Sequence, residues 1–64
     1  MGPAEALELL GIRASAEASE IDRAFRELSL TCHPDKVAHL DMDFQDLAER
    51  KFKRLLRAYE ILSS

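Results

Sequence analysis

The stretch that decides the fold of this protein is ASEIDRAFRELSLTCHPDK, residues 18–36. Ser15, which lies shortly before this stretch, is suited to cap a helix that begins at about residue 16. Pro34 ends that helix, because the residue before a proline is pushed out of the helical region. The pattern therefore predicts a helix over about residues 16–32. Its apolar residues recur at the helical steps of three and four, and they are Ala18, Ile21, Ala24, Phe25, Leu28 and Cys32.

A shorter helix is predicted before this stretch. Pro3 suits the first turn of a helix, where its missing N–H costs nothing. Gly11 suits the left-handed conformation in which many helices end. Leu7 and Leu10 form a short apolar stripe between these two residues. We predict a first helix over about residues 4–10.

A third amphipathic segment follows residue 43, and it predicts a helix over about residues 44–62. Asp41 or Asp43 could cap it, and Met42 and Phe44 are expected to pack beneath the connection that precedes it. No segment shows the alternation of a half-buried strand. The apolar stripe of this helix consists of Phe44, Leu47 or Ala48, Phe52, Leu55, Tyr59 and Leu62.

These three segments predict an all-α fold. Two long helices, about 16–32 and 44–62, would form an antiparallel hairpin, with the short helix over about 4–10 packed across it. We expect Ala24 and Ala58 to allow close approach of the long helices. The side chains expected to interlock between them are Phe25, Leu28, Phe52, Leu55, Tyr59 and Leu62.

Composition narrows the class of protein. The chain has 64 residues, enough for one domain, and 47% of them are hydrophobic, which favours a globular domain over disorder. The net charge of −3 is too mild to indicate a nucleic-acid or acidic-membrane partner. No apolar run reaches membrane-spanning length, and no signal peptide is visible. Cys32 is the only cysteine, which excludes an internal disulfide and fits a reducing compartment.

The turn after the second predicted helix carries the clearest functional signal. His33-Pro34-Asp35-Lys36 leaves the end of that helix. Because proline fixes one backbone dihedral, the flanking His33 and Asp35 would be displayed on a stiff turn at the tip of the hairpin. A displayed carboxylate suits a bidentate, charge-assisted pair with an arginine. Rigidity lowers the ordering cost of binding such a partner.

With its flanking motifs, this turn resembles the J-domain family over essentially the whole chain. Residues 7–12, Leu-Glu-Leu-Leu-Gly-Ile, look like the family's first-helix motif, with Leu7 in a position that is commonly aromatic. Residues 20–28 look like its second helix, and residues 51–62 look like its third. A bare His-Pro-Asp is weak evidence, but the two flanking helical motifs at these distances make the resemblance specific.

The resemblance implies a co-chaperone module and not an enzyme. Such a module would bind a heat-shock-seventy (DnaK-class) chaperone and stimulate its ATP hydrolysis, with no cofactor of its own and as a monomer. Asp35 would meet an arginine of the chaperone, while His33 and Pro34 hold and present it. The matching basic positions, which would face an acidic chaperone surface, are Arg23, Arg26 and Lys36.

Charge is distributed differently from the usual family pattern. Residues 19–32 carry two arginines against three acidic residues, whereas residues 46–60 carry five basic residues against three acidic ones. Asp22, Glu27 and Thr31 occupy positions that are often basic. Three explanations are open: salt bridges between the two long helices, solvated faces, or a shifted chaperone footprint. The alternative function is a J-like interaction or scaffold module without chaperone-activating ability.

The connection after the turn is long, with fourteen residues between Lys36 and Lys51. In this respect the chain resembles the DjlA-type bacterial J-domains, and part of the extra length should extend the third helix backward. We expect a single domain over residues 1–64, excised from a longer protein. We also expect a cytoplasmic location, either free or as the cytoplasmic portion of a membrane-tethered parent.

Other kinds of site find little support. Cys32, His33 and His39 lack the paired spacing of a metal site. No nucleophile constellation or glycine-rich phosphate loop is present. Nucleic-acid binding through the basic third helix is disfavoured by the overall acidity and by the lack of interleaved aromatics.

Overall fold

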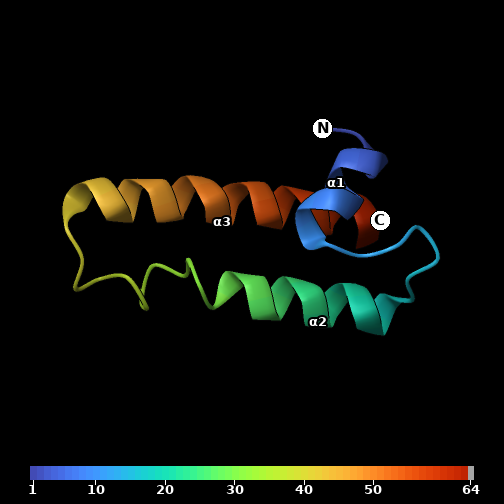
Figure 1. Cartoon of the computed structure of the whole chain (residues 1–64), viewed down its shortest axis with the longest axis horizontal. Coiled ribbons are helices and arrows are strands. Elements are labelled where there is room, and N and C mark those ends of the chain that lie inside the picture. Colours follow the sequence, from blue (N-terminus) through green and yellow to red (C-terminus); the bar gives the residue numbers. More distant parts are fainter. Residues whose placement is uncertain (64) are drawn as a thin grey trace.

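The computed structural model describes residues 1–63 and contains three helices in that range. They are α1 (Pro3–Leu10), α2 (Ala18–Ser29) and α3 (Met42–Ser63). Helices α2 and α3 run antiparallel, and α1 lies beside the C-terminal end of α3 (Figure 1). Helix α1 packs chiefly against α3. The predicted all-α hairpin with a short first helix is confirmed.

Helix α1 begins and ends as its sequence predicts. Pro3 occupies its first turn, and Gly11 at its end has φ 68°, in the left-handed region. The N–H of Gly11 donates to the carbonyl of Glu8, and the N–H of Ile12 donates to the carbonyl of Leu7, both at 3.1 Å. This pair of bonds is the Schellman arrangement, which satisfies carbonyls that would otherwise be left without partners at the helix end.

Helix α2 is shorter than the predicted 16–32 at both ends. The predicted cap, Ser15, lies in a turn closed by the N–H of Ala16 on the carbonyl of Arg13. Extended Glu17 therefore precedes the helix, without a side-chain capping bond. At the other end, the hydroxyl of Thr31 donates a hydrogen bond to the carbonyl of Leu28 at 2.7 Å. Such side-chain bonds compete with the continuing helical ladder.

Helix α3 begins two residues before the predicted start. Asp41 immediately precedes it and accepts a bond from the N–H of Gln45 through its backbone carbonyl, whereas Asp43 lies inside the first turn. The side-chain amide of Gln45 also donates to the carbonyls of Ala38 and Leu40, at 3.1 and 2.7 Å. Gln45 thus ties the connection to the helix, and the expected backward extension of this helix is confirmed.

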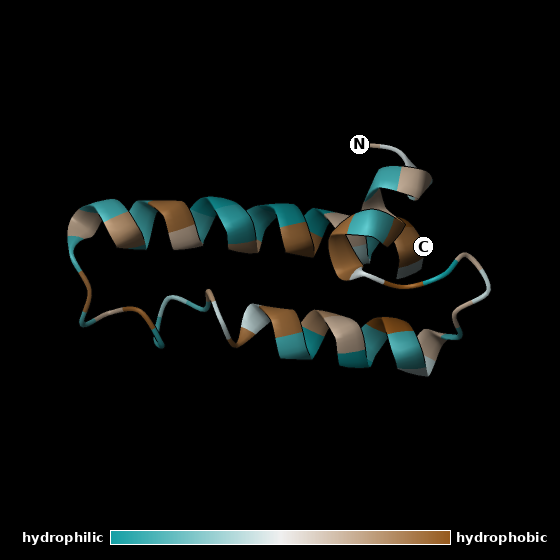
Figure 2. Cartoon of the chain, viewed as in Figure 1, coloured by the Kyte–Doolittle hydropathy of each residue, from teal (hydrophilic) through white to brown (hydrophobic). Residues whose placement is uncertain are grey.

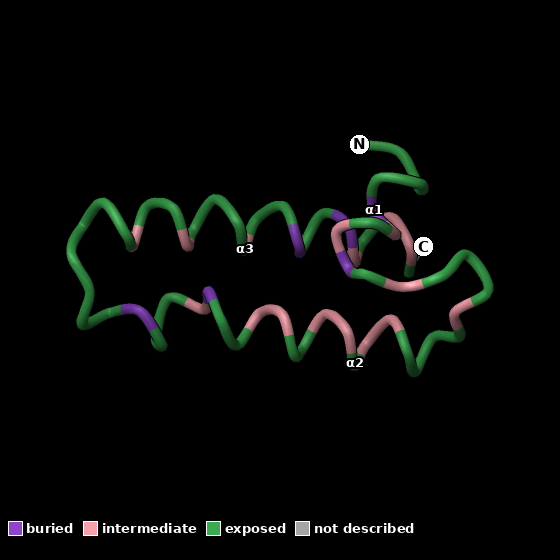
Figure 3. Tube along the Cα trace, in the orientation of Figure 1, coloured by how far each residue is buried: buried purple, intermediate pink, exposed green. Residues whose placement is uncertain are grey.

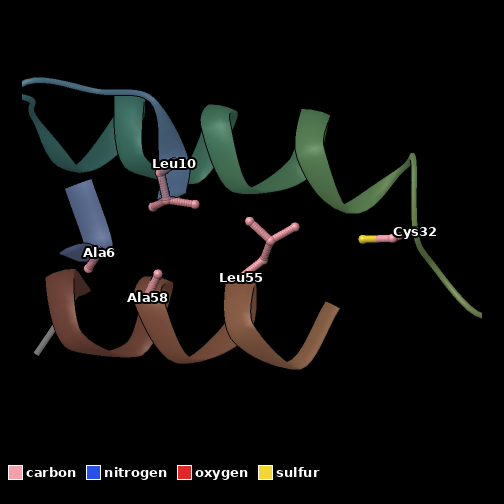
Figure 4. Close-up of a cluster of buried hydrophobic side chains, with 5 residues drawn as sticks. All are labelled: Ala6, Leu10, Cys32, Leu55 and Ala58. Atoms are coloured by element: carbon pink, nitrogen blue, oxygen red, sulfur yellow. The ribbon is translucent and has the colours of Figure 1, made fainter. Parts of the chain in front are cut away.

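The core lies where all three helices meet, and hydrophobic and hydrophilic bands alternate along α2 and α3 (Figure 2). The buried centre is made by α1, α3 and the turn after α2, whereas the residues of α2 are half-buried or exposed (Figures 3 and 4). Half-buried apolar side chains of all three helices pack around this centre. The aromatic ring of Phe25 stacks on Tyr59 at 4.7 Å and lies 6.3 Å from the ring of Phe52. The fully buried cluster consists of Ala6, Leu10, Cys32, Leu55 and Ala58.

The expectation for the first turns of α3 is wrong. Met42 is 70% exposed and Phe44 is 58% exposed, so neither packs beneath the connection. Of the two alternatives for the next stripe position, Ala48 packs against the core, whereas Leu47 is 61% exposed. The reason is geometric: α2 ends at Ser29, so it offers no helical surface opposite the beginning of α3.

Candidate functional site

The backbone after α2 forms a tight turn around Pro34. The carbonyl of His33 accepts bonds from the N–H groups of Lys36, at 2.9 Å, and Val37, at 3.3 Å. The first of these bonds closes a β-turn with proline at its second position, where the fixed φ of proline is already suitable. Val37 is buried and anchors the exit of the turn. The turn is therefore held by its own backbone and by the core.

The imidazole of His33 supports this turn from inside. Its Nδ1 accepts a bond from the backbone N–H of Asp35 at 3.2 Å. An accepting Nδ1 carries no proton, so in this arrangement the ring proton is on Nε2. The ring also meets Phe52 edge to face, with centroids 5.6 Å apart and planes at 75°. His33 therefore links the turn to α3. The role in presenting Asp35 that the resemblance implies for it stays a prediction.

The carboxylate of Asp35 is left free by these contacts. Its side chain is 92% exposed and lies 3.8 Å from Nδ1 of His33. It accepts no hydrogen bond from another described residue. Lys36 beside it is also exposed. An exposed carboxylate on a pinned turn can accept a bidentate bond from a partner's guanidinium group at little cost in ordering.

Arg23 and Arg26 lie apart from the turn, on the outer face of α2. Both are exposed. They line one shallow depression together with Ser19, Asp22 and Glu27. The structure thus gathers His33, Pro34, Asp35 and Lys36 into one turn, and it leaves the two arginines as a second feature along the helix that leads to it. Partner binding by these six residues stays a prediction.

Asp22 has a partner that the sequence pattern did not reveal. The phenol of Tyr59, on α3, donates a hydrogen bond to its carboxylate. This bond raises the pKa of Tyr59 above its ordinary 10.0, because the carboxylate stabilises the protonated phenol. The predicted place of Tyr59 between the long helices is correct, but its hydroxyl was not assigned a role. A tyrosine that faces a neighbouring helix is itself the signal, since a half-buried phenol usually finds an acceptor.

The salt bridges considered between α2 and α3 are not found among residues 1–63. The lysine–carboxylate pair in this part of the chain, Lys53 with Glu49 at 3.2 Å, lies within α3. Arg23, Arg26 and Glu27 are solvent-exposed. Of the explanations for the charge distribution, solvated faces fit the structure, with the Tyr59–Asp22 bond as the polar link between the helices.

Phe52 has a role that the sequence analysis missed. It was assigned to the core alone, but it also supports the ring of His33 and lines a groove beside Pro34. Val37 and Leu56 contribute to the same groove. The available signal was positional: in an antiparallel hairpin, the turn that follows α2 lies opposite the middle of the longer helix α3, where Phe52 stands.

Residues 1–63 offer neither a metal site nor a membrane-spanning helix. No three histidine, cysteine or acidic side chains gather there in a way that could hold a metal ion. None of the helices in that range has both the length and the apolar character that a bilayer crossing needs.

Known proteins resemble this chain over most of its length. The family model described as the DnaJ domain matches residues 5–64. The mouse protein DnaJ homolog subfamily B member 8 is 45% identical over 56 residues, which is 88% of this chain and 23% of that protein. The Xenopus tropicalis DnaJ homolog subfamily B member 6 is 42% identical over 59 residues, which is 92% of this chain and 23% of that protein. No solved structure gives a significant match.

A yeast protein is also similar to this chain. The Saccharomyces cerevisiae DnaJ protein homolog XDJ1 is 45% identical over 56 residues, 88% of this chain but 12% of that protein. The chain therefore spans less than a quarter of these relatives. They are eukaryotic proteins, so the finer likeness to DjlA-type bacterial domains finds no support among them. With a family match over nearly its whole length and the His-Pro-Asp turn in place between α2 and α3, the chain belongs to the J-domain (DnaJ domain) family.

Proposed function

We propose that this chain is a co-chaperone domain that binds a DnaK-class heat-shock-seventy chaperone and stimulates its ATP hydrolysis. The observation that carries the proposal is the geometry of Asp35. Its carboxylate is 92% exposed, while the turn beneath it is pinned by Val37 and by the contact between His33 and Phe52. A charge displayed in this way serves a partner and not the core of its own domain.

The proposed mechanism is a shift in the chaperone's conformational equilibrium. A partner's arginine would pair with Asp35, and this contact would be made better in the hydrolysis-competent state than in the resting state. Lys36, Arg23 and Arg26 would attract an acidic surface of the chaperone and raise the rate of encounter. The ATP and its chemistry belong to the partner.

Replacement of Asp35 by asparagine tests this mechanism. Asp35→Asn keeps the size and the backbone N–H that donates to His33, but removes the charge. We expect ATPase stimulation in single-turnover assays to be lost and the thermal melting curve to stay nearly unchanged. Asp43→Asn is the matched control, since Asp43 is an exposed carboxylate outside the turn, and it should stimulate normally.

Three outcomes would count against the proposal. Wild-type stimulation by Asp35→Asn would refute the role of the carboxylate. A collapse of its melting temperature would make Asp35 a structural residue. If the wild-type domain binds the chaperone but stimulates none of a panel of DnaK-class ATPases, the domain is a J-like interaction or scaffold module, which is the alternative function.

For the setting of this domain we propose the cytoplasm, either free or as the cytoplasmic portion of a membrane-tethered parent, with the domain itself a monomer. The observation that supports the cytoplasm is Cys32, a single buried thiol, which suits a reducing compartment. Fractionation of cells that express the parent protein would test the location. Light scattering on the isolated domain would test the monomer.

A further inference from the structure

A second groove lies on the other side of α3 from the turn. Its apolar lining comes from all three helices: Leu9 of α1, Leu28 of α2, and Leu47 and Leu55 of α3. Leu55 is buried and Leu9 and Leu28 are half-buried, whereas Leu47 stands 61% exposed at the edge. We call this feature the Leu47 groove. A hollow with leucines on its walls and an exposed leucine at its rim offers apolar surface to a partner.

The rim of the Leu47 groove is strongly basic. Arg50, Lys51 and Arg54 line it, all exposed and none in an ion pair with a described residue. Arg57 follows Arg54 by three residues and Arg50 by seven, so the three arginines share one side of α3. Five of the nine basic residues of the chain fall within residues 50–57. Within residues 1–63, no ion pair joins Arg50, Lys51 or Arg54 to a carboxylate.

The charge reverses at the N-terminal end of the groove. Asp43 and Asp46 line an adjoining depression together with Leu47 and Arg50. Along α3 the surface therefore changes from acidic, over its first two turns, to basic over the next two or three. An occupant that follows the helix would need the opposite order of charges, which fixes its direction as well as its composition.

The Leu47 groove is separate from the proposed chaperone site. Successive helical residues are about 100° apart, so Leu47 and Leu56 lie on opposite flanks of the buried stripe that contains Leu55. Pro34, Phe52 and Leu56 line the groove beside the turn, and none of them lines the Leu47 groove. The two grooves share no lining residue, although Asp46 lines both the groove beside the turn and the acidic depression that adjoins the Leu47 groove.

We propose that the Leu47 groove binds an acidic amphipathic helix of a protein partner. The leucine stripe of that helix would pack on Leu9, Leu28 and Leu47, its glutamates and aspartates would face the arginine rim, and a basic end would meet Asp43 and Asp46. Laying an amphipathic helix in an apolar groove is a common mode of recognition. The two aspartates disfavour a nucleic acid or an anionic membrane, since phosphates would meet like charge there.

A designed peptide of about 18 residues, or five helical turns, serves as the probe. It carries leucines at steps of three and four, glutamates beside them, and two lysines at the end that would lie over Asp43 and Asp46. One comparison peptide keeps the leucines and reverses every charge, and another scrambles the same composition. Fluorescence anisotropy measures affinity for the 64-residue chain, and backbone amide NMR shifts locate the contact.

We expect the designed peptide to bind at least about tenfold more tightly than either comparison peptide, with shifts centred on Leu47 and Arg54. Arg50→Glu with Arg54→Glu should weaken it by at least about tenfold and improve binding of the charge-reversed peptide. Lys53→Glu is the matched control on the same helix, outside the groove, and should change affinity less than about twofold. Asp35→Asn should bind normally, which keeps this test independent of the ATPase proposal.

Several results would overturn the proposal. Equal binding of the scrambled peptide would mean that charge alone attracts it. An effect of Lys53→Glu as large as that of the double variant would show that the rim is not special. Tighter binding of phosphatidylserine vesicles or duplex DNA, abolished by the same double variant, would assign the surface to a lipid or a nucleic acid instead.

Discussion

Replacement of Leu55 by alanine would test the packing at the centre of the fold. Leu55 is 3% exposed and lies in the cluster with Ala6, Leu10, Cys32 and Ala58, so its side chain touches the region where all three helices meet (Figure 4). The substitution removes three carbons, or about 2.4 kcal/mol at roughly 0.8 kcal/mol for each buried methylene. The residual cavity adds to this cost, so we expect about 3–4 kcal/mol.

That loss is nearly the whole stability of such a domain, which for this chain length is about 3–5 kcal/mol. The melting temperature should fall by about 12–32 °C, at roughly 4–8 °C for each kcal/mol. Urea titration followed by far-ultraviolet circular dichroism would measure the change. The variant should be partly unfolded at room temperature even without urea.

Leu56→Ala is the matched control because it is the same substitution at the next residue of the same helix. Leu56 is 38% exposed, lines the groove beside the turn and lies outside the buried cluster. Its replacement should cost less than about 1 kcal/mol. If Leu56→Ala destabilises the domain as much as Leu55→Ala does, the assignment of the buried face of α3 is wrong.

Three further predictions follow from the contacts of α2 and the turn. Phe52→Ala should lower the free energy of unfolding by about 2–4 kcal/mol, near or below the usual range for a core phenylalanine because the residue is only half-buried. Phe52→Leu should be more stable than Phe52→Ala but should stimulate the ATPase less than wild type, since His33 loses its aromatic partner. Tyr59 has a raised pKa, so its bond to Asp22 contributes stability that is present below pH 10 and is lost as pH rises through the folded pKa. Wild type should therefore lose more stability over this pH range than Tyr59→Phe. Tyrosinate absorbance measures the titration directly, because Tyr59 is the only tyrosine of the chain. Glu27→Lys should speed docking on a DnaK-class chaperone at low salt, with a gain that shrinks near physiological salt, where the Debye length is about 8 Å; if it does nothing and Arg54→Glu abolishes stimulation, the docking footprint has moved to α3.

The contacts of Asp22 distinguish it from Glu27, the other acidic residue considered on α2. From the sequence, Asp22 and Glu27 look alike, as two acidic residues where the family often has basic ones. The structure separates them, because Asp22 accepts the hydrogen bond of Tyr59 while Glu27 is exposed to solvent. Replacing Asp22 would therefore disturb the packing of α2 on α3 as well as the charge, so Glu27 is the cleaner position for a test of steering.

Much of the fold could be predicted because its signals are local. The steps of three and four in α2 and α3 and the left-handed Gly11 depend on residues close in sequence, and these predictions are confirmed. The prediction that Pro34 ends the second helix is wrong, because α2 already ends at Ser29. The helix limits could not be predicted as well. Whether α2 continues past Ser29 depends on the hydroxyl bonds of Ser29 and Thr31 to backbone carbonyls, which compete with a ladder of similar energy.

The predictions that needed tertiary information failed for a different reason. Phe44 fits the helical stripe of α3, but burial also requires a surface opposite it, and α2 has already ended at that level. The same mismatch in helix length leaves Leu47 exposed beside the arginine rim. A periodic pattern predicts which residues share a face, whereas the length of the neighbouring helix decides how far along that face is covered.

This difference between α2 and α3 also explains how one small domain can offer two separate surfaces. The turn is held by the end of α2 and by Phe52, so its geometry is fixed by the buried side of α3. The flank that carries Leu47, Arg50 and Arg54 contributes little to that support, and substitutions there should leave the turn intact. Charge on this flank is therefore free to serve a second partner, whereas the residues around His33 are constrained by the geometry that Asp35 requires.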